Sequence, residues 1–427
     1  MAGPPGLGAP VLISFALLFA CGTGGDPAEG PTWHSDVSPA LQGQCTRCHA
    51  PGGQGAGDYT THEAVAALAP AMIEAIQSGR MPPPVSDPDC QDYLGSEHLA
   101  PDPTLATLLQ SWIDAGDPEG DPALAPEVEA VTEQLADPDV VVTMSAPYTP
   151  TYQSARDPGN EYRCFVMEHG QTEDFYVRRM APVIDQRAIV HHALLFTVAD
   201  EDVPDHDLAM GWDCIEDAFI GGDSYEGVLS GYGLVGAWGP GAVPVEMTEG
   251  FGFRITPEMK LVIQIHYFQS DDTDGVADQS GWAFEVWDEP VQPVLIGPFG
   301  VFDFRIPAGD ADFTADTSIK LPLPITIHGV FPHMHVLGTS YSAEVTAPDG
   351  EVTCLTRSDK WDFHNQLTYT YREPIQIELD SVVSLRCSWD NSAENPNQLN
   401  EEPQDVRYGE RTDEEMCYAF SYVSLGN

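Results

Sequence analysis

The stretch "GVFPHMHVLG", Gly329 to Gly338, lies in a run of apolar and β-branched residues that is typical of a β-strand. In a strand, residues i and i+2 share one face, so His333 and His335 can hold one metal ion together while Met334 points to the other side. A lone histidine in a strand is more often a hydrogen-bonded core residue. The stretch therefore predicts β-structure with a candidate metal face, and the ligands that complete the site must come from elsewhere.

The chain from about residue 137 onward carries the same strand-like texture. Short runs of valine, isoleucine, phenylalanine and tyrosine are broken at close intervals by proline, glycine, aspartate and asparagine, which is typical of all-β sandwiches. A seam is expected at "WDEPVQPVLIG", Trp287 to Gly297, where two prolines and an acidic pair interrupt the strands. We therefore predict two β-sandwich domains, over 137–292 and 293–427.

A different composition precedes residue 137. The alanine- and leucine-rich pieces "THEAVAALAPAMIEAIQSG" (Thr61 to Gly79) and "PTLATLLQSWIDAG" (Pro103 to Gly116) each end in glycine, and this pattern predicts helices. We predict a small all-α domain over 31–120, joined to the β region by an acidic Pro/Ala linker over 121–136. The 427 residues are enough for three domains, each with its own core.

The motif "CTRCH", Cys45 to His49, is the attachment pattern of c-type haem. Cys45 and Cys48 lie one helical turn apart and would bind the two haem vinyl groups, and His49 would be the proximal iron ligand. The alternatives for the two thiols are a thioredoxin-like redox pair or half of a zinc site. The pattern predicts one covalently attached haem c.

The second axial ligand of this haem is expected to be Met81. The stretch "SGRMPPP" places Met81 in a proline-braced loop, as cytochromes c do for the sixth ligand, and "WIDAGDP" resembles the closing helix of bacterial cytochrome c domains. His34 and His62 are the alternative ligands. A thioether ligand raises the haem potential and favours electron transfer over oxygen binding. Residues 31–120 are therefore expected to form a cytochrome c-like domain.

The first 21 residues predict export. The apolar run from Val11 to Ala20 is too short to span a bilayer and ends in "LLFAC", where Leu18, Ala20 and Cys21 match a lipoprotein cleavage box. The basic residues usual before such a run are absent from "MAGPPGLGAP". We expect a bacterial lipoprotein-type signal that ends at a lipidated Cys21. The protein is then expected in the periplasm or cell envelope, held to the outer membrane by lipid alone.

The cysteine count agrees with an oxidising compartment. The chain has nine cysteines, and three are assigned above to lipid and haem. The remaining six are an even number, which suits disulfide formation. They are Cys90, Cys164, Cys214, Cys354, Cys387 and Cys417.

The charge of the chain excludes some partners. The formal net charge is −50, and the only lysines are Lys260, Lys320 and Lys360. Such a surface repels nucleic acid and anionic headgroups, so neither is expected as a partner. The acidic surface is either a heavily hydrated, salt-adapted exterior or a docking face for a basic redox partner.

Histidines also occur in two earlier strand-like segments. "AIVHHALLF" contains His191 and His192, and "LVIQIHYFQ" contains His266. Adjacent His191 and His192 would face opposite ways in a regular strand, so sharing a metal requires a local distortion or side chains that fold around an edge. The alternative is that one of the pair faces inward and the other outward.

These segments together resemble a known family. "VHHALLF", "GAWGPGAVPVEMTEGFGFRI", "LVIQIHYF", "PHMHVLG" and "TDEEMC" occur in the order and rough spacing seen in copper type II monooxygenases, the family of peptidylglycine α-hydroxylating monooxygenase and dopamine β-monooxygenase. The resemblance runs from about residue 137 to the C-terminus. It implies two jelly-roll β-sandwiches side by side, in agreement with the strand texture.

The resemblance implies two copper ions with three protein ligands each. An electron-transfer copper would be held by His191, His192 and His266. An oxygen-activating copper would be held by His333, His335 and Met416. Imidazole accepts both copper oxidation states, and a thioether favours Cu(I), the state that meets dioxygen.

Two further expectations concern the sequence around Met416. Without the resemblance, Met416 would be interpreted as a core methionine beside aromatic residues. The family also implies a disulfide between Cys387 and Cys417, which would hold the sulfur ligand in place. The other four cysteines do not map onto the family and are left unassigned.

The sequence departs from the peptide-amidating members of the family in the substrate region. Those enzymes hold the substrate carboxylate with an arginine before the His-x-His pair, and with an asparagine and a tyrosine after the methionine. Phe331, Tyr418 and Phe420 stand at these positions here, either as substrate-pocket residues or as packing residues. A neutral or aromatic substrate therefore fits better than a peptidylglycine. Gln264 matches a family residue and is expected to be a hydrogen-bonding neighbour.

We thus expect an exported copper-dependent monooxygenase that hydroxylates a C–H bond of a small organic substrate with O2. Electrons would come from a periplasmic donor through the fused haem domain. The alternative is a non-catalytic copper and haem lipoprotein that transfers electrons. A third interpretation, a haem electron carrier with a β-sandwich binding module, predicts haem without stoichiometric copper.

Overall fold

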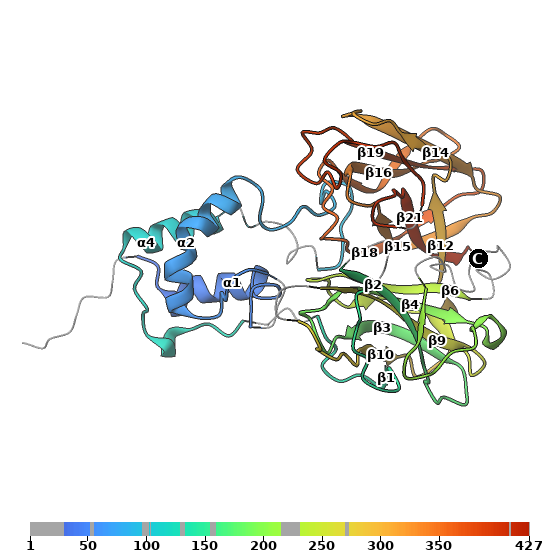
Figure 1. The fold of residues 1–427 in the computed structure, drawn as a ribbon, viewed down its shortest axis with the longest axis horizontal. Coiled ribbons are helices and arrows are strands. Elements are labelled where there is room, and N and C mark those ends of the chain that lie inside the picture. Colours follow the sequence, from blue (N-terminus) through green and yellow to red (C-terminus); the bar gives the residue numbers. More distant parts are fainter. Residues whose placement is uncertain are drawn as a thin grey trace, which may run out of the picture.

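The computed structural model describes residues 30–51, 55–95, 102, 104–128, 133–153, 159–214, 231–269, 273–409 and 411–426. The expected signal segment, with Cys21, lies outside these residues. Figure 1 shows a group of helices on one side of two adjoining lobes of strands. No helix among the described residues is long and apolar enough to cross a membrane.

The helices lie in the N-terminal part of the chain. They are η1 (Trp33–Val37), α1 (Ser38–Gln44), α2 (His62–Gln77), α4 (Leu105–Asp114) and η2 (Pro122–Leu124). Helices α2 and α4 form where the two alanine- and leucine-rich pieces predict them. Thr61 begins α2 because its side chain accepts a hydrogen bond from the Ala64 N–H. The helices share a small apolar core that includes the buried Trp33 and Trp112 and is separate from the core of the strands.

The first lobe is a sandwich of two sheets. One sheet has the order β5-β2-β9-β4-β6, and the other has the order β1-β10-β3-β8-β11, with β7 paired to β3. The elements of this lobe are β1 (Val140–Thr143), β2 (Asn160–Met167), β3 (Phe175–Val183), β4 (Val190–Val198), η3 (Asp200–Asp202), β5 (Trp212–Asp213), β6 (Gly233–Trp238), β7 (Val245–Glu246), β8 (Phe251–Ile255), β9 (Lys260–Phe268), β10 (Gly281–Val286) and β11 (Gln292–Pro293).

The second lobe has two four-stranded sheets, β12-β21-β15-β18 and β14-β19-β16-β17, and a short pair, β13-β20. Its strands are β12 (Leu295–Gly300), β13 (Arg305–Ile306), β14 (Phe313–Lys320), β15 (Ile325–His333), β16 (Gly338–Thr346), β17 (Val352–Ser358), β18 (Tyr369–Ile377), β19 (Val382–Trp389), β20 (Val406–Arg407) and β21 (Tyr418–Leu425). This β-rich architecture agrees with the predicted sandwich class.

One continuous apolar cluster joins the two lobes. It contains fully buried rings from both, including Tyr267 and Trp282 in the first lobe and Trp389 in the second. Phe253 on β8 meets Tyr422 on β21, with ring centroids 5.6 Å apart. Burial of aromatic surface on this scale favours a fixed arrangement of the two lobes.

The described residues contain three disulfides. They are Cys90–Cys354, Cys164–Cys214 and Cys387–Cys417. Cys164–Cys214 lies within the first lobe and Cys387–Cys417 within the second. Cys90–Cys354 ties the segment between α2 and α4 to the second lobe, across 264 residues of sequence. Cys45 and Cys48 are free thiols.

Candidate metal centres

The first histidine group lies where β4 and β9 pair in the first lobe. His192 stands directly opposite His266 in the β4–β9 ladder, and the register shifts between Val190 and His192. The shift makes His191 the extra residue of a β-bulge. Because of this bulge, the adjacent His191 and His192 both reach the side on which His266 lies. The local distortion that sharing a metal requires is therefore present in the strand.

The ring nitrogens of this group converge. His191 Nδ1 lies 3.2 Å from His192 Nδ1, which in turn lies 3.4 Å from His266 Nδ1. His266 Nε2–H donates to Asn160 Oδ1 at 2.6 Å, which leaves the Nδ1 lone pair of His266 pointing at the other two rings. The three ligand atoms all lie within 4.8 Å of one another. A cation between them would satisfy lone pairs that otherwise face each other, so this donor set fits a copper ion.

Burial keeps these three imidazoles neutral. It lowers the pKa of His191 to about 4, with a smaller contribution from the nearby His364. Burial also lowers the pKa values of His192 and His266 well below the usual 6.5. Charge repulsion from neighbouring histidines lowers the pKa of His192 further. His266 and His191 contribute most, followed by His333 and His335 of the second lobe. Neutral imidazole is the form that ligates a metal, so the ligands do not have to lose protons at neutral pH.

The second histidine group lies at the end of β15. His333 is the last residue of that strand and pairs with Tyr418 on β21, and His335 follows two residues later. The two rings lie 5.1 Å apart. His333 Nδ1–H donates to Gln366 Oε1, and His335 Nδ1–H donates to Glu414 O at 3.0 Å. Each Nε2 is thereby left as the ligating atom.

Burial also controls the protonation of the second group. It lowers the pKa of His333 to about 3 and that of His335 to about 4. Met334, between them, is fully buried in the apolar core and does not line the cavity described below. The strand itself ends at His333, but the predicted division of the side chains is present: His333 and His335 face the cavity, and Met334 faces the core.

Met416, the predicted third member of the second group, lies beside this cavity. It is 4% exposed and lines the same cavity as His333 and His335. The next residue, Cys417, forms the disulfide with Cys387 on β19. Both sequence neighbours of Met416 are therefore fixed in place: Cys417 by the disulfide, and Glu415 by its burial.

Glu415 links the backbone of the His-x-His segment to Met416. Its carboxylate accepts hydrogen bonds from His335 N–H at 2.9 Å, Leu337 N–H at 2.6 Å and Trp389 Nε1–H at 2.9 Å. Burial raises the pKa of Glu415 to about 8, although these three bonds oppose the shift. A single side chain therefore positions both the histidine and the methionine parts of the second group.

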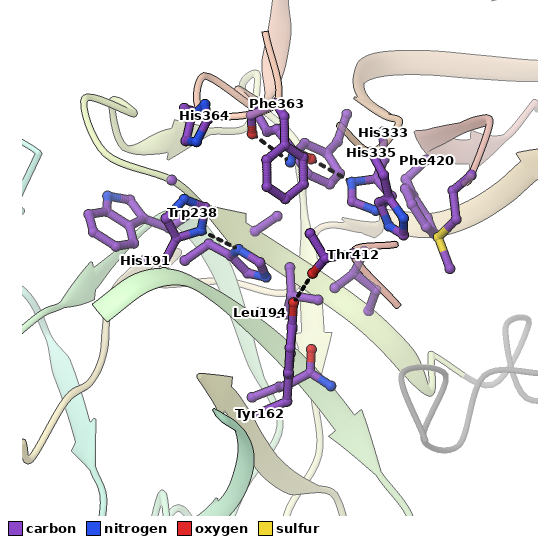
Figure 2. A pocket seen from close by; sticks show the side chains of 18 of the residues that line it. Tyr162, His191, Leu194, Trp238, His333, His335, Phe363, His364, Thr412 and Phe420 are labelled. Carbon is purple, nitrogen blue, oxygen red and sulfur yellow. Dashed lines mark hydrogen bonds between the residues drawn. The ribbon is translucent and has the colours of Figure 1, made fainter. Parts of the chain in front are cut away.

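Members of both groups line one cavity of about 90 Å³ between the lobes: His191 and His192 from the first group, and His333 and His335 from the second. In Figure 2, His191 and Trp238 lie on one side and His333, His335 and Phe420 on the other. Tyr162 OH of the first lobe meets Thr412 Oγ1 of the second at 2.8 Å, below the cavity in this view. Tyr162 also stacks on the His266 ring, with centroids 4.1 Å apart. Residues from both lobes therefore build this site.

The lining of the cavity is mostly apolar. Its members are Tyr162, His191, His192, Leu194, Phe196, Leu234, Ala237, Trp238, Gly239, Pro240, Gln264, Phe331, His333, His335, Phe363, His364, Gln366, Thr412, Met416 and Phe420. Among the described residues that line it, none is lysine or arginine. Phe331 and Phe420 face the cavity, whereas Tyr418 stacks behind Phe420 and is not a lining residue. Gln264 lines the cavity and donates to Cys214 O at 3.3 Å.

The "CTRCH" segment borders a second, larger cavity of about 280 Å³. Cys45, Cys48 and His49 lie on its wall together with Met81. His49 Nδ1–H donates to Ala56 O at 2.8 Å, which leaves Nε2 free to ligate. Most of the remaining wall is apolar, from Tyr59, Met72, Ala75, Ile76, Pro82, Pro83 and Leu105. Two thiols, an imidazole and a thioether around an apolar space fit a covalently bound haem.

The alternatives for this segment fit less well. Burial raises the pKa of Cys45 to about 11 and also raises that of Cys48, whereas a redox-active thiol pair needs a lowered pKa. In the described part of the chain, the only metal-type cluster of three histidine, cysteine or acidic side chains is His191, His192 and His266. His34 and His62 do not line this cavity.

Three residues that position the metal-site histidines could not be found from the sequence. Asn160 lies on β2, next to β9, and Gln366 lies in the loop before β18. Neither stands at a fixed spacing from the histidine that it contacts. Glu415 was visible only as part of "TDEEMC", beside Met416. Such partners depend on strand pairing and chain folding, so no local pattern marks them.

Comparison with known proteins adds one family match. Residues 305–423 match the copper type II ascorbate-dependent monooxygenases, C-terminal domain. The matched range contains His333, His335 and Met416, whereas the first histidine group lies outside it. The match supports this family and, with it, a copper-dependent oxidoreductase. No curated protein matches the chain.

Solved structures give only distant likenesses. The major capsid protein P2 of bacteriophage PM2 is 8% identical with a TM-score of 0.25, covering 67% of this chain and 97% of that one. A Broad Bean Stain Virus structure is 7% identical with a TM-score of 0.24, covering 70% and 95%. An infectious bursal disease virus structure (Gx strain) is 9% identical with a TM-score of 0.17, covering 68% and 72%. Likenesses at this level support no conclusion about function.

Proposed function

We propose that this protein is a copper-dependent monooxygenase that hydroxylates a C–H bond of a small, uncharged organic substrate with O2. The observation that carries the proposal is the pair of histidine groups on opposite walls of one apolar cavity. Copper bound at these groups would supply one-electron redox chemistry and activation of dioxygen. Two separate groups suit a reaction that consumes two electrons.

The residues of the first group are proposed to hold the electron-transfer copper. His191, His192 and His266 are neutral at physiological pH, and the His266 ring is fixed by Asn160 and by stacking on Tyr162. A rigid set of three imidazoles accepts both oxidation states of copper with little rearrangement. The first lobe therefore contributes a site for storing an electron.

His333, His335 and Met416 are proposed to hold the copper that meets oxygen. Gln366 and the Glu414 carbonyl fix the two rings through Nδ1, while Glu415 and Cys387–Cys417 hold the methionine. A thioether among the ligands favours Cu(I). The apolar wall beside this group excludes water, which limits loss of reactive species to solvent.

The substrate class follows from the cavity lining. Phe331, Phe363 and Phe420 lie beside the second histidine group, and no lysine or arginine among the described lining residues is available for a carboxylate. An uncharged aromatic or aliphatic molecule would bury its surface against these rings. Gln264 and Thr412 offer hydrogen bonds that could orient a single polar group.

The haem is proposed as the electron source for the coppers. Cys45 and Cys48 would bind it covalently, and His49 and Met81 would be its axial ligands. A periplasmic one-electron donor would reduce it. Export with a lipid anchor at Cys21 would place the protein in the envelope, where three disulfides are stable.

The test compares Met416→Ile with the matched core variant Met167→Ile. Met167 is fully buried on β2 and does not line the cavity. Met416→Ile is expected to abolish substrate-dependent hydroxylation, measured by incorporation of labelled oxygen, while the haem spectrum stays unchanged. Met167→Ile is expected to keep the activity. Hydroxylation retained in Met416→Ile would refute the assignment of Met416 as a copper ligand. If the copper-loaded wild-type protein hydroxylates no substrate, the protein is a non-catalytic redox protein instead.

A further inference from the structure

The cavity at the haem-attachment segment and the cavity between the histidine groups share a wall. His191, Pro240 and His364 line both. His191 is a member of the first metal group, and its ring lies 5.8 Å from His364 in an edge-on arrangement. Phe363 lies nearly parallel to the same His191 ring, also at 5.8 Å. A single layer of residues therefore separates the two cavities, and this layer contains His191, a candidate ligand of the first copper.

The "CTRCH" segment packs directly on the glycine-rich loop beside this wall. Gly241 O accepts a hydrogen bond from Arg47 Nη1–H at 2.7 Å, and Gly241 N–H donates to Glu133 Oε1 at 2.8 Å. A Cβ on Gly241 would lie 2.8 Å from Cys48 Sγ, and the Gly241 φ angle is +81°. Only glycine allows this approach, which places the haem-binding cysteine against the first lobe.

The connection between α2 and α4 is fastened to the second lobe. Ser86 N–H donates to Tyr369 Oη at 2.9 Å, and Leu94 N–H donates to Thr370 O at 2.8 Å. Tyr93 is 1% exposed within the apolar core that joins the lobes. The Cys90–Cys354 disulfide makes the attachment covalent. The helical part is thus held at both lobes, and its position does not depend on a flexible linker.

We propose that electrons enter the copper sites within one chain, across the wall formed by His191, Pro240 and His364. This inference rests on the proposed function. Haem held by Cys45, Cys48 and His49 would give one electron to copper held by the first group, so that ferrous iron would become ferric as Cu(II) became Cu(I), and an external one-electron donor would reduce the haem again. The His364 ring meets His191 edge-on, and its Nδ1 lies 3.4 Å from Asp362 Oδ1.

The test uses the full-length, copper-loaded haem protein without oxygen. A flash of photoreductant adds one electron to the haem, whose return to the ferric state is followed by its absorbance, and Cu(II) is measured by electron paramagnetic resonance. The expected result is reoxidation at a rate that does not change with protein concentration, together with loss of one equivalent of Cu(II) signal. In copper-depleted protein the haem stays ferrous. A rate proportional to protein concentration, or haem that stays ferrous although copper is bound, would overturn the proposal.

Gly241→Val tests the contact, with Gly350→Val as its matched control. Gly350 also has a positive φ, +93°, but a Cβ there meets no atom within 4 Å. Gly241→Val is expected to lose the concentration-independent phase, whereas Gly350→Val keeps it; retention in both would refute the contact as the route. Hydroxylation driven by a small reductant without haem-to-copper transfer would leave the proposed function standing. Failure of the protein to bind copper would refute both.

Discussion

Lowering the pH of the metal-free protein from 7.5 to 5.5 is expected to remove a large part of its stability. Six histidines of the two lobes, three buried and three half-buried, have pKa values below the usual 6.5, and desolvation is the first cause in each case. They are His191, His192, His266, His328, His333 and His335. A folded-state pKa below the unfolded value means that the unfolded state binds more protons. Stability from these groups is therefore full above pH 6.5 and is lost as the pH falls toward about 4.

The size of the effect follows from the number of neutral histidines. Between pH 7.5 and 5.5 each unfolded imidazole gains nearly one proton, which costs about 1.4 kcal/mol for every histidine that stays neutral when folded. The six together lose about 8 kcal/mol. Glu415 opposes this, because its raised pKa of about 8 stabilises the folded state by about 2.5 kcal/mol over the same interval. A net loss of about 5 kcal/mol is comparable with the whole stability of a small domain.

The assay is urea unfolding of copper-free protein, followed by tryptophan fluorescence at the two pH values. His191→Gln and His335→Gln, one from each group, should each reduce the pH-dependent loss by about 1.4 kcal/mol. Met167→Ile should lower stability equally at both pH values, because it removes no titratable group. Equal stability at pH 7.5 and 5.5, or variants that leave the difference unchanged, would contradict the burial of neutral imidazoles described here.

Other predictions follow from single contacts. Trp389→Phe removes the Nε1–H bond to Glu415 and should lower the free energy of unfolding by about 1–3 kcal/mol, measured by urea titration; no change would mean that the carboxylate is satisfied without it. Replacing Cys90 and Cys354 together by serine should cost about 2–5 kcal/mol and expose the segment after Met81 to protease; undiminished thermal stability would contradict this attachment. Replacing Cys45 and Cys48 together by alanine should abolish covalent haem, seen by haem staining of a denaturing gel, while the copper content is retained. Loss of both haem and copper would contradict separate binding sites for them.

The fold class could be predicted from local pattern, because alternating apolar residues and frequent turn residues mark sandwich strands over about 137–427. The helices α2 and α4 were also visible from composition and their closing glycines. Pairings between distant strands were not visible. The sequence around His192 and His266 does not indicate that these residues pair across β4 and β9. It also does not indicate the bulge in β4 at His191. Only the resemblance to a family related them.

The disulfide pairing, except for Cys387–Cys417, and the contacts between the helical part and the lobes could not be predicted from the sequence. Six cysteines allow 15 disulfide pairings. The Cys90–Cys354 bridge joins the segment between α2 and α4 to the second lobe. The contact of Cys48 with Gly241 depends on how separate parts of the chain pack. The motif "AWGPGAVPVEM" indicated the family, but no sequence pattern predicts that it packs against the "CTRCH" segment.

The most direct test of the central claim is a crystal structure of copper-loaded protein with anomalous diffraction measured at the copper absorption edge. Two anomalous peaks are predicted, one among His191, His192 and His266 and the other among His333, His335 and Met416. A single peak, or copper bound away from these two groups, would contradict the assignment of this protein as a two-site copper monooxygenase.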